Sequence, residues 1–233
     1  MIVVGIETST PQVSVAVGTE RGVLGRIQVT GRARQEVVTP ALERLLAWTR
    51  VDLAHVGGFA VGVGPGLFTG LRIGVETAKT LAQVTGAPIV GLVSLDVLAY
   101  AARLTPRAIV AAIDGRRGEV FWARYRQVPG GVLRDTPYAV ARPEAVVAEL
   151  EAEPDEVLLV GDGAMLYHDV FGELGARAEF ASPVSAHPDA AHMVELAVPR
   201  FLREEHDRLF EVVPMYLRRS DAEIAWDERA RGA

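Results

Sequence analysis

Apolar and polar positions alternate from the first residues and predict a strand-rich start to the chain. Residues 2–7 form an apolar run that ends at an acid, Glu7. A polar turn of residues 8–11 follows, and residues 13–17 then alternate between apolar and small polar positions. Alternation with a period of two is typical of a half-buried strand. Together with residues 22–29, these segments predict a three-stranded antiparallel meander.

The next 75 or so residues alternate between helical and strand patterns. Val38, Leu42, Leu45 and Leu46 lie on one stripe of a helix, because they recur with a period near 3.6 residues. Thr69 and Ser94 suit the N-cap position at which a hydroxyl satisfies free backbone N–H groups. The predicted elements are strands over residues 58–63 and 88–92 and helices over residues 69–84 and 94–103.

The same order of elements then starts again. Asp114 lies 107 residues after Glu7, and each acid ends an apolar strand and precedes a polar turn into a second strand. Residues 158–163 repeat the strand and glycine turn of residues 59–64, and residues 143–150 predict the helix between them. This repetition indicates a duplicated α/β unit with mixed sheets. We predict the two-lobed, actin-like ATPase (ribonuclease H-like) fold, with lobes over residues 1–103 and 104–187 and a segment 188–233 that packs back on the first lobe.

In such a fold, the two acid-ended turns face each other across a cleft. The candidate nucleotide residues in that cleft are Glu7, Thr8, Ser9 and Asp114, with backbone N–H groups of residues 8–10 as phosphate donors. The alternative is a pair of ordinary hairpins without a ligand. The sequence has no lysine-bearing phosphate loop, and it leaves both interpretations open.

The segment from Gly64 to Gly74 carries the densest signal, because it follows a strand and opens a helix. It matches neither a phosphate-binding P-loop nor a complete dinucleotide-binding glycine motif. Small residues recur at every fourth position of the predicted helix: Gly70, Gly74, Ala78 and Ala82. A glycine inside a helix costs about 1 kcal/mol relative to alanine, so Gly74 requires a close approach of another backbone. That neighbour is either a partner chain or the protein's own sheet, and the pattern does not decide between them.

The amino-acid composition excludes several classes of function for this chain. The 233 residues include no cysteine, and 24 basic against 30 acidic side chains give a net charge of −6, which disfavours tight direct binding to RNA. The five histidines lack the His-x-x-x-His spacing of zinc sites, and there is no Gly-x-Ser-x-Gly element, so we expect neither a metal site nor catalytic residues. No apolar run reaches the roughly 18 residues of a membrane span, and we expect a cytoplasmic protein without membrane contact.

Four segments resemble the bacterial TsaB (YeaZ) family, in order and at fitting spacing. They are Ile6–Thr10, Gly64–Gly74, Ile113–Arg116 and Pro214–Arg218. The second of these, Gly-Pro-Gly-x-Phe-Thr-Gly-Leu-Arg-Ile-Gly, is the most specific match. Glu7 departs from the family pattern, in which an aspartate is usual at this position.

The resemblance implies a non-catalytic subunit of the machinery that makes N6-threonylcarbamoyladenosine beside the anticodon of tRNA. It implies the actin-like fold, binding to the catalytic paralogue TsaD and to the ATPase TsaE, a homodimer when the chain is alone, and tRNA contact only through the complex. Any ATP or ADP would bind weakly or in dependence on the partner. An enzyme of the same architecture, a small kinase or a peptidase, is the alternative, and a nucleotide-binding sensor is a third. The residues expected at the partner interface are Gly64, Pro65, Gly66, Phe68, Thr69, Gly70, Leu71, Arg72, Gly74 and Ala78.

Overall fold

Two mixed β-sheets form the framework of the protein. The computed structural model describes residues 1–31 and 35–218. The first sheet has the order β3-β2-β1-β4-β5, and the second has the order β8-β7-β6-β10-β11, with β9 paired to β7. The strands of the first sheet are β1 (Ile2–Glu7), β2 (Gln12–Thr19), β3 (Gly22–Thr30), β4 (Gly58–Gly64) and β5 (Ile89–Val93). Those of the second are β6 (Ala108–Arg116), β7 (Glu119–Val128), β8 (Gly131–Arg134), β9 (Ala139–Ala141), β10 (Val157–Val160) and β11 (Ala178–Phe180).

The two sheets are built on one plan, which confirms the predicted duplication. In the first sheet, β1 to β3 form an antiparallel meander, and β4 and β5 add to β1 in parallel. In the second sheet, β6 to β8 form the meander, and β10 and β11 add to β6 in parallel. The predicted actin-like, ribonuclease H-like fold is therefore confirmed.

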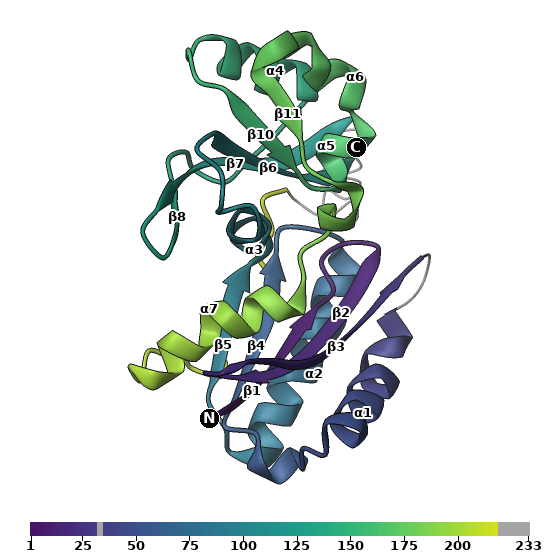
Figure 1. Ribbon diagram of the computed structural model, residues 1–233. Coiled ribbons are helices and arrows are strands. Elements are labelled where there is room, and N and C mark those ends of the chain that lie inside the picture. The colour runs from purple at the N-terminus through teal and green to yellow at the C-terminus, as the bar shows by residue number, and fades with distance from the viewer. Residues whose placement is uncertain (32–34, 219–233) are drawn as a thin grey trace, which may run out of the picture.

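Helices cover both faces of the first sheet (Figure 1). One face packs against α1 (Val38–Thr49) and α2 (Phe68–Thr85), which share a buried apolar cluster with alternate side chains of β1 and β2. The opposite face packs against α7 (Ala190–Leu202). The approach of α7 is close, since a Cβ atom at Gly5 would lie 2.7 Å from the carbonyl oxygen of Ala190. This close approach is why β1 carries a glycine at its centre.

The second sheet is covered in the same manner. One face packs against α4 (Pro143–Glu151), α5 (Asp162–Leu166) and α6 (His168–Phe171). The other face packs against Leu95, Leu98 and Ala99 of α3 (Ser94–Ala101). The remaining described helices are short 3-10 turns at Gln35–Val37, Leu53–His55, Gly172–Arg177 and Pro183–Ser185.

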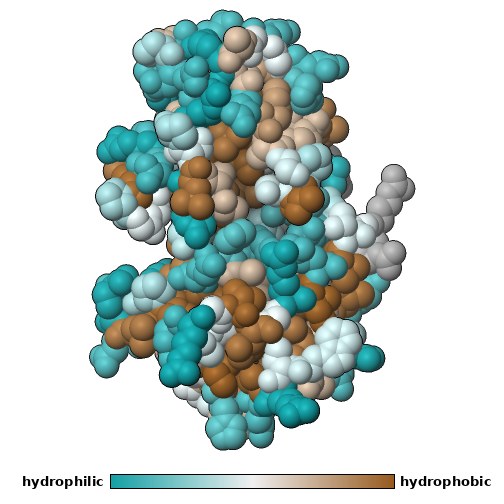
Figure 2. Space-filling view, in the orientation of Figure 1, coloured by the Kyte–Doolittle hydropathy of each residue, from teal (hydrophilic) through white to brown (hydrophobic). Residues whose placement is uncertain are grey.

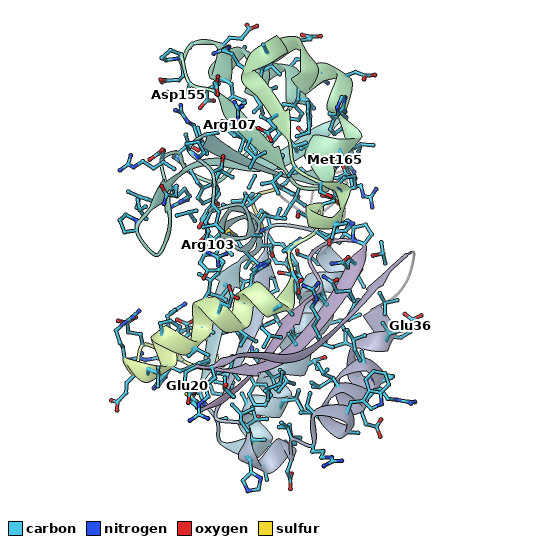
Figure 3. All side chains as sticks on the ribbon, in the orientation of Figure 1. Glu20, Glu36, Arg103, Arg107, Asp155 and Met165 are labelled. Atoms are coloured by element: carbon cyan, nitrogen blue, oxygen red, sulfur yellow. The ribbon has the colours of Figure 1, made fainter. Side chains whose placement is uncertain are left out.

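The last helix of each half thus packs on the sheet of the other half. α3 follows β5 of the first sheet but covers the second, and α7 follows β11 of the second sheet but covers the first. The two helices also meet, because Arg103, just after α3, donates a hydrogen bond to Glu195 of α7 at 3.4 Å (Figure 3). The lobe boundary after residue 103 stays a prediction, and α3 contacts both lobes. Of the segment 188–233, α7 lies on the first sheet, and residues 219–233 lie outside the described residues.

Two predicted helix caps are wrong. α2 begins at Phe68, and the residue before it, Leu67, makes no side-chain capping bond, so Thr69 lies inside the first turn. α3 begins at Ser94 itself, and its hydroxyl bonds to Glu7 instead of to its own helix. The Ser94 contact is with another strand of the fold, and a local capping rule does not include such a contact.

Figure 2 shows that apolar side chains reach this face of the molecule on both lobes, with polar side chains between them. Within residues 1–31 and 35–218, no helix combines the length and the apolar character that a membrane span requires.

Candidate functional site

Glu7, at the end of β1, is an internal anchor of the first lobe. Its side chain is fully buried and accepts hydrogen bonds from the backbone N–H of Ser9 at 2.6 Å and from the hydroxyl of Ser94 at 3.0 Å. Burial raises the pKa of Glu7, and these hydrogen bonds partly oppose that rise. Gly62 of β4 leaves the space for the carboxylate, since a Cβ atom there would lie 2.2 Å from Glu7 Oε2.

The turn after β1 is clamped by the segment that opens α2. Thr8 Oγ1 donates a hydrogen bond to the carbonyl oxygen of Gly70 at 2.8 Å. Leu67 N donates to the carbonyl oxygen of Ser9 at 2.7 Å, and a Cβ atom at Gly66 would lie only 2.1 Å from that oxygen. The glycines of this segment therefore let two backbones meet at van der Waals distance.

This packing leaves the residues of the predicted nucleotide cleft in the first lobe buried. Glu7, Thr8 and Ser9 are all 0% exposed, and the N–H of Ser9 is already bonded to the carboxylate of Glu7. These groups are closed to solvent in this structure, and the assignment of Glu7, Thr8, Ser9 and Asp114 to a nucleotide cleft stays a prediction. The expected weak or partner-dependent binding of ATP or ADP has no support from these residues and stays untested.

Asp114 occupies the equivalent position of the second lobe, and its contacts differ from those of Glu7. Its Oδ1 accepts the N–H of Arg116 at 2.8 Å, and its Oδ2 lies 3.0 Å from the Arg116 guanidinium. Its own N–H donates to Oδ1 of Asp162 at 3.0 Å. Burial raises the pKa of Asp162 to about 6, and the nearby carboxylate of Asp114 adds to the rise. Asp162 was not predicted as a site residue, although the sequence places it in the glycine turn after β10.

The small-residue face of α2 packs inside the protein. Gly70, Gly74 and Ala78 are buried, and a Cβ atom at Gly74 would lie 2.2 Å from Thr8 Oγ1. Ala78 belongs to the apolar core under α1 and α2. The close neighbour that the sequence requires is the protein's own turn after β1. Gly64, Pro65 and Leu71 are buried as well. The assignment of these residues to a partner interface stays a prediction.

Three predicted interface residues do lie on the surface: Phe68, Thr69 and Arg72. The rings of Phe68 and Tyr216 stack with centroids 5.1 Å apart, and the Arg72 guanidinium carbon lies 4.2 Å from the centroid of the Phe68 ring. Arg72 Nε also donates a hydrogen bond to Tyr216 Oη at 3.3 Å. Phe68 is 39% exposed and Tyr216 46% exposed. We call Phe68, Arg72 and Tyr216 the aromatic–arginine cluster. Tyr216 was missed as a site residue, although the segment Pro214–Arg218 contains it.

A groove continues along the exposed side of α2 and is shared with α1. Its volume is about 380 Å³. Its floor is partly apolar and its rim carries hydroxyl groups and one acid, a composition that suits a docked helix. The residues that line it are Thr39, Leu42, Glu76, Thr77, Thr80 and Leu81.

Within the described part of the chain, no group of three or more histidine, aspartate or glutamate side chains is arranged to hold a metal ion.

Comparison with known proteins places this architecture in a family. A family model described as TsaD, tRNA N6-adenosine threonylcarbamoyltransferase, matches residues 19–226. The chain belongs to this family.

The chain is also similar from end to end to curated proteins named TsaB. It is 29% identical over 229 residues to the tRNA threonylcarbamoyladenosine biosynthesis protein TsaB of Escherichia coli (strain K12), with 97% of each chain covered. A crystal structure of an uncharacterized Pseudomonas aeruginosa protein, described as similar to peptidase YeaZ, superposes with a TM-score of 0.81 at 29% identity. That match covers 93% of this chain and 99% of the other. The resemblance to the TsaB (YeaZ) group is thereby confirmed.

The fold extends to more distant proteins. The ROK hexokinase of Thermus thermophilus superposes with a TM-score of 0.51 at 14% identity, covering 85% of this chain and 100% of that chain. At this level of identity the match bears on the fold alone.

Proposed function

We propose that this chain is a non-catalytic scaffold and dimerisation subunit required for threonylcarbamoyl transfer to the N6 of the adenosine adjacent to the anticodon in tRNA. The observation that carries this proposal is the end-to-end similarity to the protein named TsaB in Escherichia coli, which covers 97% of both chains. Its partners would be the catalytic paralogue, TsaD, and the ATPase, TsaE, in the cytoplasm. Contact with tRNA would come through that complex.

The geometry of the first turn supports a role without chemistry of its own. Phosphoryl-transfer sites need charged groups and backbone donors that reach the phosphates. Here the acid at the end of β1 is fully buried and bonded to Ser9 and Ser94. A carboxylate used in this way holds β1, α3 and the turn together, which is a structural role and not a catalytic one.

The exposed side of α2 is the surface that fits a partner. Aromatic and arginine side chains are the types that most often dominate the binding energy of an interface. The aromatic–arginine cluster supplies both types, and the groove between α1 and α2 extends the surface with apolar and hydroxyl groups. We assign this combined surface to the TsaD-type subunit, and we expect a second copy of the chain to use it when that subunit is absent.

Reconstitution tests the proposal. Purified chain, TsaD-type protein and TsaE-type protein from the same organism are combined with unmodified tRNA, ATP and the threonylcarbamoyl donor, and the modified nucleoside is quantified by mass spectrometry. We expect modification only when this chain is present and none when it is supplied alone. Modification at the full rate without this chain would contradict the proposal, as would the absence of a complex on size-exclusion chromatography.

An enzymatic role is the second candidate, because the similar Pseudomonas aeruginosa protein is described by its likeness to a peptidase. The purified chain would then hydrolyse a peptide or ATP by itself. Loss of that hydrolysis in Asp114→Ala, with an unchanged fold, would favour this candidate over the scaffold.

A further inference from the structure

The segment Pro214–Arg218 was singled out in the sequence, and the structure shows that it connects three parts of the protein. It follows Val212, which is 4% exposed and belongs to the core beneath α1 and α2. Met215 N then donates a hydrogen bond to the carbonyl oxygen of Val63 in β4 at 2.7 Å. The path of this segment is therefore fixed by the carboxyl-terminal end of β4, an interior strand of the first sheet.

The next residue, Tyr216, holds the aromatic–arginine cluster together. Its ring stacks on Phe68, and its hydroxyl accepts the hydrogen bond from Arg72 Nε at 3.3 Å. Because Nε is engaged in this bond, the Arg72 guanidinium is held over the Phe68 ring, and its two terminal amino groups remain for an acceptor on another chain. Without Tyr216, the side chains of Phe68 and Arg72 can adopt more rotamers. Binding must then restrict them again, which costs affinity.

The following two residues reach the other lobe. Leu217 packs against the apolar cluster between α3 and the second sheet. Arg218 Nη1 donates to Oε2 of Glu119, the first residue of β7, at 2.8 Å, and the two side chains are only 23% and 32% exposed. Four consecutive residues thus touch β4, α2 and the second sheet.

We propose that Tyr216 is a positioning residue of the partner-binding surface and that the Arg218–Glu119 ion pair makes this surface depend on the second lobe. The partner is the TsaD-type subunit, so this inference rests on the proposed function. The chemistry that the cluster recognises is a carboxylate for Arg72 beside an apolar side chain for the Phe68 ring. The surface is built jointly by α2 and by a segment 144 residues further along the chain.

Two variants of Tyr216 test the positioning role. The dissociation constant for the TsaD-type protein is measured by calorimetry for the full chain, Tyr216→Ala and Tyr216→Phe. We expect about tenfold weaker binding for Tyr216→Ala, a larger loss than most interface residues show on truncation. Tyr216→Phe keeps the ring stack and loses only the bond to Arg72, so we expect a smaller loss of about threefold. Phe210→Ala is the matched control, because Phe210 is an aromatic residue of the same terminal segment that is 80% exposed.

The ion pair is tested by charge reversal. We expect Arg218→Glu and Glu119→Arg each to weaken binding by about threefold, and the double variant to recover the affinity of the unmodified chain. Circular dichroism and thermal unfolding are recorded for every variant, and rescue in the double variant is a result that general destabilisation would not give.

The outcomes separate this inference from the proposed function. If the unmodified chain binds the TsaD-type protein but Tyr216→Ala binds equally well, the positioning role is wrong and the proposed function stands. If Arg218→Glu and Glu119→Arg both bind the TsaD-type protein as tightly as the unmodified chain does, the partner-binding surface does not depend on the second lobe. The same conclusion follows if the double variant does not recover the affinity of the unmodified chain. If Tyr216→Ala weakened only the self-association of the chain and left its binding to the TsaD-type protein unchanged, the surface would belong to the contact with a second copy. That result would overturn the choice of partner. If the unmodified chain binds no TsaD-type protein, the proposed function fails and this inference fails with it.

Discussion

Ser94 Oγ donates a hydrogen bond to Oε2 of Glu7 at 3.0 Å, and both residues are 0% exposed. This contact joins the end of β1 to the first residue of α3, the helix that covers the second sheet. A buried carboxylate that loses a donor is left partly unsatisfied. We therefore expect Ser94→Ala to lower the free energy of unfolding by about 1–3 kcal/mol.

Urea unfolding followed by far-ultraviolet circular dichroism measures this change. Thr80→Ala on the exposed side of α2 is the control, because its hydroxyl bonds only to the carbonyl oxygen of Glu76 in its own helix. A Ser94→Ala variant as stable as the unmodified chain would show that the contact does not anchor α3.

The second prediction concerns Gly74 and Thr8. A Cβ atom at position 74 would lie 2.2 Å from Thr8 Oγ1, so Gly74→Ala must displace Thr8 or shift α2. Overpacking of this kind costs about 1–3 kcal/mol, which exceeds the roughly 1 kcal/mol that alanine gains in helix propensity. We expect Gly74→Ala to lower the melting temperature of the isolated chain, even without any partner.

A double-mutant cycle checks the cause. In Thr8→Ala the clashing oxygen is gone, so adding Gly74→Ala should cost less than it does in the unmodified chain. Equal costs in both backgrounds would mean that the two positions do not contact each other. If Gly74→Ala retained full stability and lost only partner binding, the buried placement of this helix face would be contradicted.

The third prediction is a pH dependence from Asp162. Its pKa is raised to about 6 in the folded chain by burial, against an ordinary value of 3.8. The folded state therefore favours the protonated carboxyl, and this contribution to stability is present at low pH and is lost as the pH rises through 3.8 toward about 6. Asp162→Asn keeps the oxygen that accepts the Asp114 N–H but cannot ionise. Relative to this variant, the unmodified chain should lose about 2 kcal/mol between roughly pH 4.5 and pH 7.

Chemical unfolding of the two proteins at several pH values measures the difference, in which titrations common to both proteins largely cancel. The groups near Asp162 are Asp114, Arg116 and His187, and burial lowers the pKa of the histidine. Parallel stability curves for the two proteins would show that the carboxyl of Asp162 is not shifted in this way.

The fourth prediction is that Arg72→Glu weakens binding to the TsaD-type protein without a comparable loss of folding stability. Arg72 is an exposed residue of α2, and its contacts within the chain are to the exposed rings of Phe68 and Tyr216. Reversal of its charge should weaken binding to the TsaD-type protein by tenfold or more, by about the amount expected for an arginine at the centre of an interface. Unfolding should change little, because exposed sites affect stability by about 0.5 kcal/mol or less.

Calorimetric titration and urea unfolding of the same preparation give both quantities. Arg208→Glu is the control, because the Arg208 side chain is 85% exposed and its ion pair is with Glu211 rather than with the aromatic–arginine cluster. If Arg208→Glu weakened binding as much as Arg72→Glu, the effect would come from the net charge and not from the aromatic–arginine cluster.

The sequence predicted the fold well because the fold follows from local patterns that occur twice. β1 runs from Ile2 to Glu7 as predicted, and the helix predicted over 69–84 is observed over Phe68–Thr85. The small residues of α2 correctly indicated a close backbone neighbour. They could not identify it, because a partner helix and the protein's own turn require the same absence of side chains. Tyr216 was missed because its contact with Arg72 spans 144 residues, a separation at which periodicity carries no information.

The exchange of the last helices between the two sheets has a consequence for how the chain is made. Until α7 has been synthesised, the face of the first sheet that carries Val3, Ala16 and Ala60 is covered only by Val97 of α3, because the other helical residues of this apolar cluster belong to α7. We therefore expect this apolar face to stay exposed while the chain is being synthesised. The amino-terminal half can complete its native packing only after residues 190–202 have left the ribosome exit tunnel. We expect a chain truncated between the halves to be insoluble and co-expression of the two fragments to restore solubility, because each fragment supplies a helix that packs on the sheet of the other.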